Sequence, residues 1–260
     1  MLVIPAIDLH GGQCVRIRRQ RYAVESDYFA DPVAMAKLWR VMNAKVLHLV
    51  DLDAAGWQSG YEPPDNDAPA HNRSHAAAIA RALDIPVQIG GGIASPEAAR
   101  AALGLGIARV VFGPVTEANA DDAAEAVRAL GASRVAVGID PLRAPVEDAP
   151  ALARELERRG ARRIVYTAVD RSGERSHPDV PAIRRLTEGL ARARVTVAGG
   201  VSGVEDLLAL RAVQRVDSVV IGRALYENAF PCQRFWSWQR PQDVDLSRFS
   251  TARLALRSDD

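Results

Sequence analysis

The chain has 260 residues, 48% apolar and 25% charged, and a length near 250 residues fits one α/β barrel as well as two smaller domains. Its 33 lysines and arginines balance 32 aspartates and glutamates, so no one-signed field favours nucleic acid or a membrane surface, and we expect neither partner. Two distant cysteines, Cys14 and Cys232, argue against a disulfide framework or zinc site and favour a cytoplasmic location.

Short apolar runs rich in valine and isoleucine recur along the whole chain. They are continuous rather than alternating, which is typical of strands buried on both faces of a parallel sheet. In chain order the predicted strands are Leu2–Ile7, Val46–Val50, Pro86–Ile89, Arg109–Phe112, Arg134–Ile139, Arg163–Thr167, Arg194–Ala198 and Ser218–Ile221.

Segments with helical spacing lie between these runs. Asp31-Pro32 and Ser95-Pro96 each combine an N-cap residue with a proline at the first helical position. The predicted helices are Val33–Asn43, Ala76–Leu83, Ala98–Leu105, Ala123–Leu130, Ala151–Arg159, Val180–Leu190 and Val204–Val213. Repeated strand–helix alternation predicts an α/β fold closed into a (β/α)8 TIM barrel over residues 1–230, with a doubly wound open sheet as the alternative. Residues 231–260 are expected to form a C-terminal extension, packed on the barrel or solvated.

An internal repeat favours the closed barrel. The same number of residues separates Gly91 from Gly199 and Glu97 from Glu205, and both glycines begin similar turns. Further along, Val110–Gly113 is matched by Val219–Gly222 in nearly the same register. A half-chain repeat of this length predicts two four-unit halves that face each other.

Glycine-rich strand ends suggest where an anion would bind. Such ends expose backbone N–H groups in front of a helix, and those groups can cradle a phosphate. The ends in question carry Gly91, Gly92 and Gly113 in the first half, and Gly199, Gly200, Ser202, Gly222 and Arg223 in the second. In a barrel the later pair lies side by side after the last two strands, a common phosphate site, and the earlier pair forms the same arrangement opposite it. We therefore expect a small-molecule ligand with a phosphate at each end, although glycines that merely allow tight turns are the simpler alternative.

Two aspartates follow apolar runs directly. Asp8 follows the first run and Asp140 the fifth, and these strands are opposite in an eight-stranded barrel. Partial desolvation at the rim raises a carboxyl pKa, so the pair could serve as acid and base. For a single rim aspartate, an N-cap or a salt bridge is the competing role.

Other polar residues at strand ends are weaker candidates. Alternation places His48 on the side opposite Asp51, and we expect a structural role for His48. Asp51 could hold ligand hydroxyls or neighbouring strand ends, and Thr167 could bond Asp140. Neither a metal-binding histidine motif nor a Gly-x-Gly-x-x-Gly pattern occurs in the sequence, so we expect no metal and no cofactor.

Several motifs together resemble one known family. They are Ile4-Pro5-Ala6-Ile7-Asp8-Leu9, Leu47-His48-Leu49-Val50-Asp51-Leu52-Asp53, Gly90-Gly91-Gly92-Ile93, Ala198-Gly199-Gly200-Val201-Ser202 and Ile221-Gly222-Arg223-Ala224-Leu225-Tyr226. The pattern is similar to the phosphoribosylformimino-5-aminoimidazole carboxamide ribotide (ProFAR) isomerases of histidine biosynthesis, from Met1 to about Ala229. The resemblance implies a TIM barrel and an Amadori rearrangement of an aminoaldose to an aminoketose. It also implies that Asp8 is the base, that Asp140 is the acid with Thr167 in support, and that no cofactor is needed.

The loops depart from that family. After the sixth run the family has two aspartates that are missing here, and Asp170 is the residue that could replace one of them. The loop 141–148 is shorter than the family's, which carries an Arg and a Trp against the substrate. Ala94 stands where the family has Arg, and Pro114, which has no N–H, stands where it has Thr or Ser. Trp57, in a long second loop over 54–75, either replaces the missing Trp or packs within its own loop.

Three functions remain open at this point. The first is the histidine-biosynthesis isomerase, an enzyme acting on a bis-phosphorylated phosphoribosyl-aminoimidazole carboxamide. The second is a paralogous barrel enzyme for another phosphoribosyl or sugar-phosphate compound, which the altered loops would suit. The third is a non-catalytic sugar-phosphate-binding barrel. For each we expect a monomer or weak homo-oligomer.

Overall fold

Eight parallel strands close into a barrel in the computed structural model, which describes residues 1–18, 21–23, 31–56, 68–167, 177–227 and 229–230. The strands in barrel order are β1 Leu2–His10, β4 Leu47–Asp51, β5 Val87–Gly90, β6 Arg109–Phe112, β7 Val135–Ile139, β8 Arg163–Thr167, β9 Arg194–Ala198 and β10 Val216–Ile221. β10 pairs with β1 in register Leu2 with Ser218. This pairing confirms the predicted (β/α)8 barrel and excludes the open sheet.

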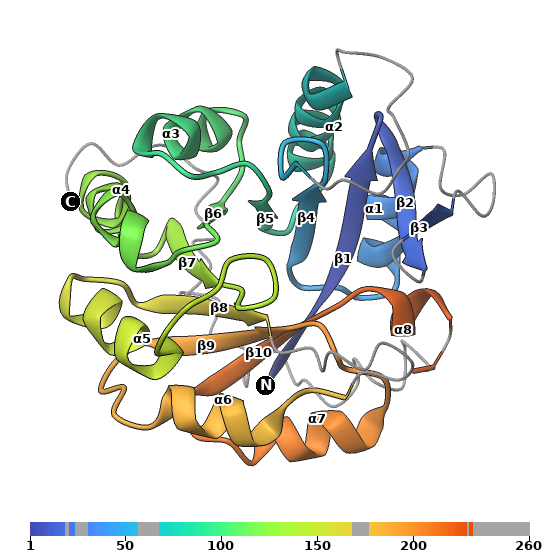
Figure 1. Ribbon diagram of the computed structural model, residues 1–260. Helices are drawn as coiled ribbons and strands as arrows, with labels where there is room; N and C mark the ends of the chain where they lie inside the picture. Colours follow the sequence, from blue (N-terminus) through green and yellow to red (C-terminus); the bar gives the residue numbers. More distant parts are fainter. Residues whose placement is uncertain (19–20, 24–30, 57–67, 168–176, 228, 231–260) are drawn as a thin grey trace.

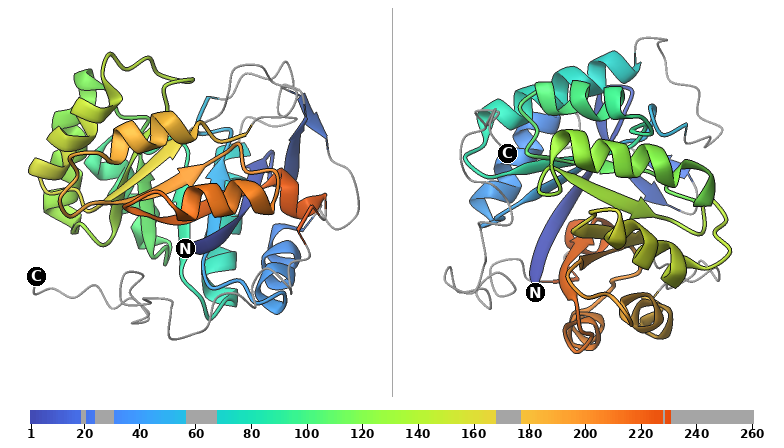
Figure 2. Two further views of the ribbon diagram at one scale, coloured as in Figure 1. Left: turned by 90° about the horizontal axis from the view of Figure 1, so that it is seen from below. Right: turned by 90° about the vertical axis from the view of Figure 1, so that its left-hand side faces the viewer.

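Helices cover the outside of the barrel (Figures 1 and 2). They are α1 Pro32–Val41, α2 Ala68–Ala82, α3 Pro96–Gly104, α4 Ala120–Leu130, α5 Ala149–Arg158, α6 Val180–Thr187, α7 Val204–Arg211 and α8 Arg223–Tyr226, with a short 3-10 turn, η2, at Glu117–Asn119. As the sequence predicts, the side chains of Asp31 and Ser95 accept bonds from the first N–H groups of α1 and α3. Among the helices of the described ranges, none has the length and apolarity to cross a membrane.

Two local features differ from the prediction. A hairpin, β2 Gln13–Arg18 and β3 Arg21–Ala23, extends β1 at the barrel edge, and Gly11 and Gly12 turn the chain with φ of 56° and 76°. Helix α2 begins at Ala68 rather than Ala76, so the predicted long second loop is wrong over its last residues. Its first turns bury Asn72 rather than an apolar residue, which hides the helical period from a hydrophobicity pattern.

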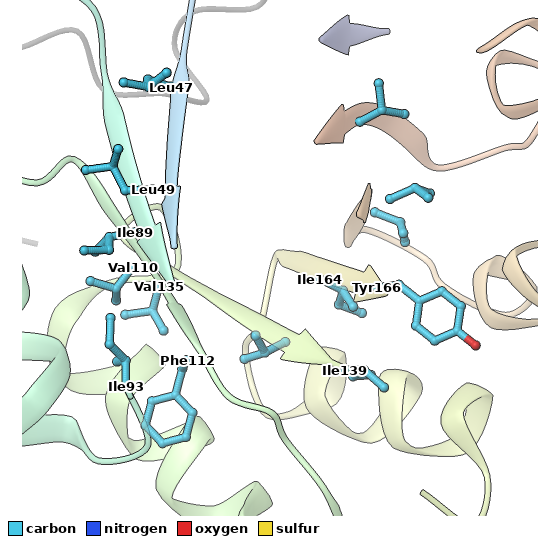
Figure 3. Packing of buried hydrophobic residues seen from close by; sticks show 14 of the residues in the cluster. Leu47, Leu49, Ile89, Ile93, Val110, Phe112, Val135, Ile139, Ile164 and Tyr166 are labelled. Atoms are coloured by element: carbon cyan, nitrogen blue, oxygen red, sulfur yellow. The ribbon is translucent and has the colours of Figure 1, made fainter. Parts of the chain in front are cut away.

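The strands bury both faces. Their outward side chains pack under the helices in one large apolar layer, part of which is shown in Figure 3 with Leu49, Ile89 and Phe112. Their inward side chains fill the barrel in two small apolar clusters. Buried polar residues, including Gln88, Arg109 and Arg163, also lie on these strands.

The internal repeat has a structural counterpart. Gly91 and Gly92 adopt φ of 102° and 65°, and the matching Gly199 and Gly200 adopt 79° and 76°. A helix follows each pair, α3 or α7. The two halves therefore present the same turn at the same level of the barrel, on β5 and on β9.

Candidate active site

A cavity of about 570 Å³ opens where the strands end at their carboxyl side. All eight barrel strands contribute to its lining; the inward residues include Ala6, His48, Gly90, Val111, Gly138, Val165, Ala198 and Val220. A space of this volume suits a ligand of metabolite size, and the mouth of an α/β barrel is the usual place for one.

Asp8 lies at the rim of this cavity. Its register is fixed on both sides, because it pairs with Val50 of β4 and with Val15 of β2. The side chain is partly buried and lines the cavity. Burial raises the pKa of Asp8 to about 7, so the carboxyl holds its proton far more strongly than an aspartate in water.

Asp140 lies across the cavity, immediately after β7. β1 and β7 are four strands apart in the closed sheet of eight, so the two carboxyls face each other from opposite strands. Oδ1 of Asp140 accepts hydrogen bonds from the N–H groups of Leu142 and Arg143 at 3.1 and 3.3 Å, and Thr167 bonds the same side chain. Burial raises the pKa of Asp140, and these bonds and the Arg143 charge act against that rise. The structure thus brings together Asp8, Asp140 and Thr167, as the sequence predicts.

His48 is buried one step deeper than Asp8. It pairs in register with Ala6, lines the cavity, and its Nδ1 lies 3.0 Å from the Gln88 amide nitrogen. Burial lowers the pKa of His48 to about 4, so the ring is neutral at neutral pH. His48 is therefore a neutral polar group beneath the ligand space.

Asp51 points away from the cavity, into a buried polar cluster between β4 and α2. Its Oδ1 accepts from the Asn72 amide at 2.7 Å and from the N–H of Ala54 at 3.0 Å. Asn72 also donates to Asp53 at 2.7 Å and accepts from the N–H of Gly12 at 2.9 Å. Of the two roles predicted for Asp51, this geometry supports the holding of strand ends.

The same cluster includes residues that the sequence does not single out. His10 pairs with Asp53, whose other oxygen accepts from the N–H of Gly11 at 2.8 Å. Asn72 is fully buried at the centre of these bonds. No motif or periodicity marks an asparagine inside a helix as central, so only the contacts identify it.

The glycines after β5 and β6 form the first predicted cradle, defined as Gly91, Gly92 and Gly113. All three line the cavity with positive φ. A Cβ on Gly91 would lie 2.1 Å from the Asp51 carbonyl oxygen, and one on Gly92 would lie 2.6 Å from Ala54. Glycine is therefore required here by close backbone approach, and the turn that results also presents backbone to the ligand space.

The second predicted cradle, Gly199, Gly200, Ser202, Gly222 and Arg223, is only partly at the cavity. Gly199, Gly222 and Arg223 line it. The Asp206 carboxylate accepts from both the N–H and the hydroxyl of Ser202, at 2.7 and 2.9 Å. Gly200 packs against Pro178. The donors that the sequence assigns to Ser202 are thus already bonded within the protein, and this cradle depends on Gly199, Gly222 and Arg223.

Among the described residues that line the cavity, the arginines are Arg143 and Arg223. Trp57 and Asp170, the remaining candidates, lie outside the described residues. In the part of the chain that is described, no three His, Cys, Asp or Glu side chains are grouped to hold a metal ion.

Comparisons with known proteins point to one family. A family model described as "Histidine biosynthesis protein" matches residues 2–231. A protein of Salinibacter ruber is 46% identical over 265 residues, covering 97% of this chain and 99% of the relative. Relatives from Chlorobaculum parvum and Prosthecochloris aestuarii are 39% and 38% identical, each covering 97% of this chain, and 98% and 97% of the relative. All three are named 1-(5-phosphoribosyl)-5-((5-phosphoribosylamino)methylideneamino)imidazole-4-carboxamide isomerase.

Proposed function

Because this chain belongs to the histidine-biosynthesis protein family, we propose that it is the isomerase for which its relatives are named. Its substrate would be the bis-phosphorylated phosphoribosyl-aminoimidazole carboxamide in that name, and its reaction an Amadori rearrangement of aminoaldose to aminoketose. The observation that carries the proposal is the pair of carboxyls, Asp8 and Asp140, on opposite strands of one cavity between two glycine turns.

The two carboxyls divide the proton transfers. Asp140 gives a proton to the ring oxygen while the substrate's own amine forms a Schiff base at C1, which opens the ribose. Asp8 then removes the C2 proton, and the electron pair moves into the Schiff base to give an enaminol. A proton added at C1 and the loss of one from the C2 hydroxyl complete the aminoketose. With a pKa near 7, Asp8 can both accept and return a proton at neutral pH.

The supporting residues hold these groups in place. Thr167 bonds Asp140 and limits its rotation. His48, neutral and bonded to Gln88, provides a polar contact below the sugar without adding charge. Positioning of this kind supplies a large share of the rate in proton-transfer enzymes, and it needs no cofactor when the substrate provides its own Schiff base.

The glycine turns bind the two phosphates in this proposal. Gly91, Gly92 and Gly113 present backbone at one end of the cavity, and Gly199, Gly222 and Arg223 present backbone and charge at the other. A ligand with one phosphate at each end would place its sugar carbons between Asp8 and Asp140. Ser202 would bind this phosphate only if its N–H and hydroxyl groups donate to the phosphate as well as to Asp206.

The two alternative functions, a paralogous enzyme and a non-catalytic barrel, have less support. Identity of 46% over nearly the whole chain to a protein named as the isomerase weighs against a changed substrate. In the described part of the chain, no ion pair involves Asp8 or Asp140, although a silent barrel would be free to neutralise them in that way. We also expect a cytoplasmic enzyme, a monomer or weak homo-oligomer, and no nucleic-acid partner.

Complementation of a histidine auxotroph that lacks this isomerase tests the proposal. The wild-type chain should restore growth, and Asp8→Asn and Asp140→Asn should each lower kcat by about 100-fold or more, because each removes a proton-transfer group. The exposed Asp122→Asn serves as the matched control and should complement fully. A soluble, folded wild type that neither complements nor isomerises the substrate in vitro would exclude the proposed function.

A further inference from the structure

We propose that Tyr226 is a positioning residue for Asp8, because its hydroxyl bond to the Ala6 carbonyl holds β1 in place where that strand changes from one neighbour to the next. This inference rests on the proposed function only for the role of Asp8 as the base. The bond itself, and its place between β10 and β2, are features of the fold.

One edge of β1 changes its partner close to Asp8. β10 pairs with this edge as far as Pro5, and β2 begins to pair with it at Asp8. β4 occupies the opposite edge. Among the described strands, therefore, none pairs with Ala6 and Ile7 on the β10 side. Backbone polar groups in this short segment need a partner from outside the sheet if the segment that leads into Asp8 is to be fixed.

Tyr226 is a partner of this kind. It lies in α8, which begins two residues after the end of β10. Its hydroxyl donates to the carbonyl oxygen of Ala6 at 3.0 Å. The short helix therefore holds β1 at the point where β10 no longer does, and the two elements lie side by side (Figure 1).

The ring of Tyr226 is packed against a second buried ring. It meets Trp39 of α1 edge to face, with the ring centroids 5.2 Å apart and the planes at 87°. The indole nitrogen of Trp39 lies 3.5 Å from the Tyr226 oxygen, at the long limit for a hydrogen bond. Aromatic packing of this geometry is favourable, and it leaves the hydroxyl little freedom to move away from Ala6.

The bond lies between two parts of the candidate site. Ala6 lines the cavity two residues before Asp8, and a Cβ on Gly222 would lie 3.8 Å from the Ala6 side chain. Helix α8 carries Arg223 of the second cradle at its first residue and Tyr226 at its last. Loss of the hydroxyl would let β1 move relative to this helix. Asp8 would then shift relative to a ligand held by Gly222 and Arg223.

The titratable groups around Asp8 leave its own titration readable. On β2, burial raises the pKa of Cys14 to about 12, and on α8 burial raises the pKa of Tyr226 above its usual range. On β4, burial lowers the pKa of His48 to about 4. These three groups therefore keep their charge from about pH 5 to about pH 9. Asp140, across the cavity, also has a raised pKa, so an Asp8→Asn variant is needed to identify the signal of Asp8.

Steady-state kinetics of Tyr226→Phe test the proposal, with Thr187→Val as the matched control. The first variant keeps the ring and removes the hydroxyl. The second also removes a hydroxyl that donates to a backbone carbonyl, that of Arg184 at 2.9 Å, on a buried residue outside the cavity lining. Displacement of the base should lower kcat by about 10-fold or more in Tyr226→Phe and leave KM within about 3-fold. Thr187→Val should keep the wild-type kcat.

An unchanged kcat in a folded Tyr226→Phe would overturn the proposal. So would a fall in kcat that Thr187→Val shares, because it would reflect a general loss of stability rather than the position of the base.

Titration of the Asp8 carboxyl separates this inference from the proposed function, because it needs no substrate. NMR of the aspartate carboxyl carbons reports their protonation, and the signal that disappears in Asp8→Asn belongs to Asp8. In Tyr226→Phe the midpoint should fall by about one pH unit, because a displaced β1 lets water reach the carboxyl. In Thr187→Val it should stay at the wild-type value.

The two measurements together distinguish the outcomes. If the wild type proves inactive on the substrate but the Asp8 midpoint still depends on Tyr226, the function is wrong and the positioning is right. If the wild type is active and Tyr226→Phe keeps both the kcat and the midpoint, the positioning is wrong. Should Tyr226→Phe fail to fold, Trp39→Phe replaces it, since it removes the indole edge that orients the Tyr226 ring. It should then shift kcat and the midpoint in the same directions, and wild-type values would overturn the proposal.

Discussion

At the scale of single residues, the carboxyl of Asp8 occupies a partly buried position that disfavours its charged form. Asp8 belongs to β1, whose neighbours in the core are apolar, and burial raises its pKa from 3.8 to about 7. Below pH 4 the carboxyl is protonated in both the folded and the unfolded chain, so burial costs nothing. As the pH rises from about 4 to about 7, only the unfolded chain releases the proton, and the folded state becomes relatively less stable.

Asp8→Asn should therefore stabilise the protein at high pH, although the proposed function predicts that it lowers kcat. The shift in the pKa of Asp8, at about 1.4 kcal/mol per unit, corresponds to an upper limit of roughly 4–5 kcal/mol for the gain at pH 8 over the wild type. At pH 4 the two proteins should differ little. Urea unfolding at both pH values checks this, with Asp122→Asn as an exposed control that should stay within about 0.5 kcal/mol. An Asn variant that is equally stable, or less stable, at pH 8 would mean that the Asp8 carboxyl is well solvated.

At the scale of elements, α2 fastens two strand ends beside the cavity. Asn72 connects the end of β1, through Gly12 N–H, to the end of β4, through Asp51 and Asp53. Asp51 in turn packs its carbonyl against Gly91 in the first cradle. One buried amide thus sets the relative position of β1, which carries Asp8, and the first glycine turn.

Asn72→Ala should destabilise the fold by about 2–4 kcal/mol, because it leaves two buried carboxylates and a backbone N–H without their partner. Arg73→Ala, at the next and exposed position of the same helix, should change stability by less than about 0.5 kcal/mol. Chemical denaturation of the two variants measures the difference. Equal effects would show that water replaces the amide without cost.

At the scale of the whole molecule, a buried ion pair lies where the last strands close the barrel. Arg163 of β8 donates to both carboxylate oxygens of Asp217 at 2.8 and 3.0 Å, and its side chain is 6% exposed. It also bonds Thr196 of β9 and Ser218 of β10. These contacts join the last three strands at the level where β10 pairs with β1 and completes the ring.

Arg163→Met should lower the free energy of unfolding by about 3–5 kcal/mol, because it leaves the poorly solvated Asp217 carboxylate without its positive partner. The Arg40–Asp84 pair is the control, since its side chains are 36% and 66% exposed. Arg40→Met should cost less than about 1 kcal/mol. Thermal and urea unfolding would compare the two. A small change in stability for Arg163→Met would indicate that water solvates the Asp217 carboxylate.

Local signals account for the elements that the sequence predicts well. Continuous runs of valine and isoleucine mark the eight barrel strands, and Asp-Pro or Ser-Pro pairs mark the starts of α1 and α3. The hairpin after β1 carries a local signal too, since Gly11-Gly12 is a favoured two-residue turn followed by alternating residues. The early start of α2 could not be predicted from hydrophobic periodicity, because the polar residue Asn72 is buried where that pattern predicts an apolar side chain.

The sequence by itself determined the barrel, the two-fold repeat of glycine turns and the placement of Asp8 and Asp140 on opposite strands. Each depends on residue order and on the period of buried positions, which are local properties. Tertiary structure alone decided how polar atoms are shared: Asp51 and Asn72 behind the cavity, Asp206 at the Ser202 donors, and Arg143 across the mouth to Ala55. Hydrogen-bond partners far apart in the chain meet only when the sheet closes, because direction and distance select them rather than composition.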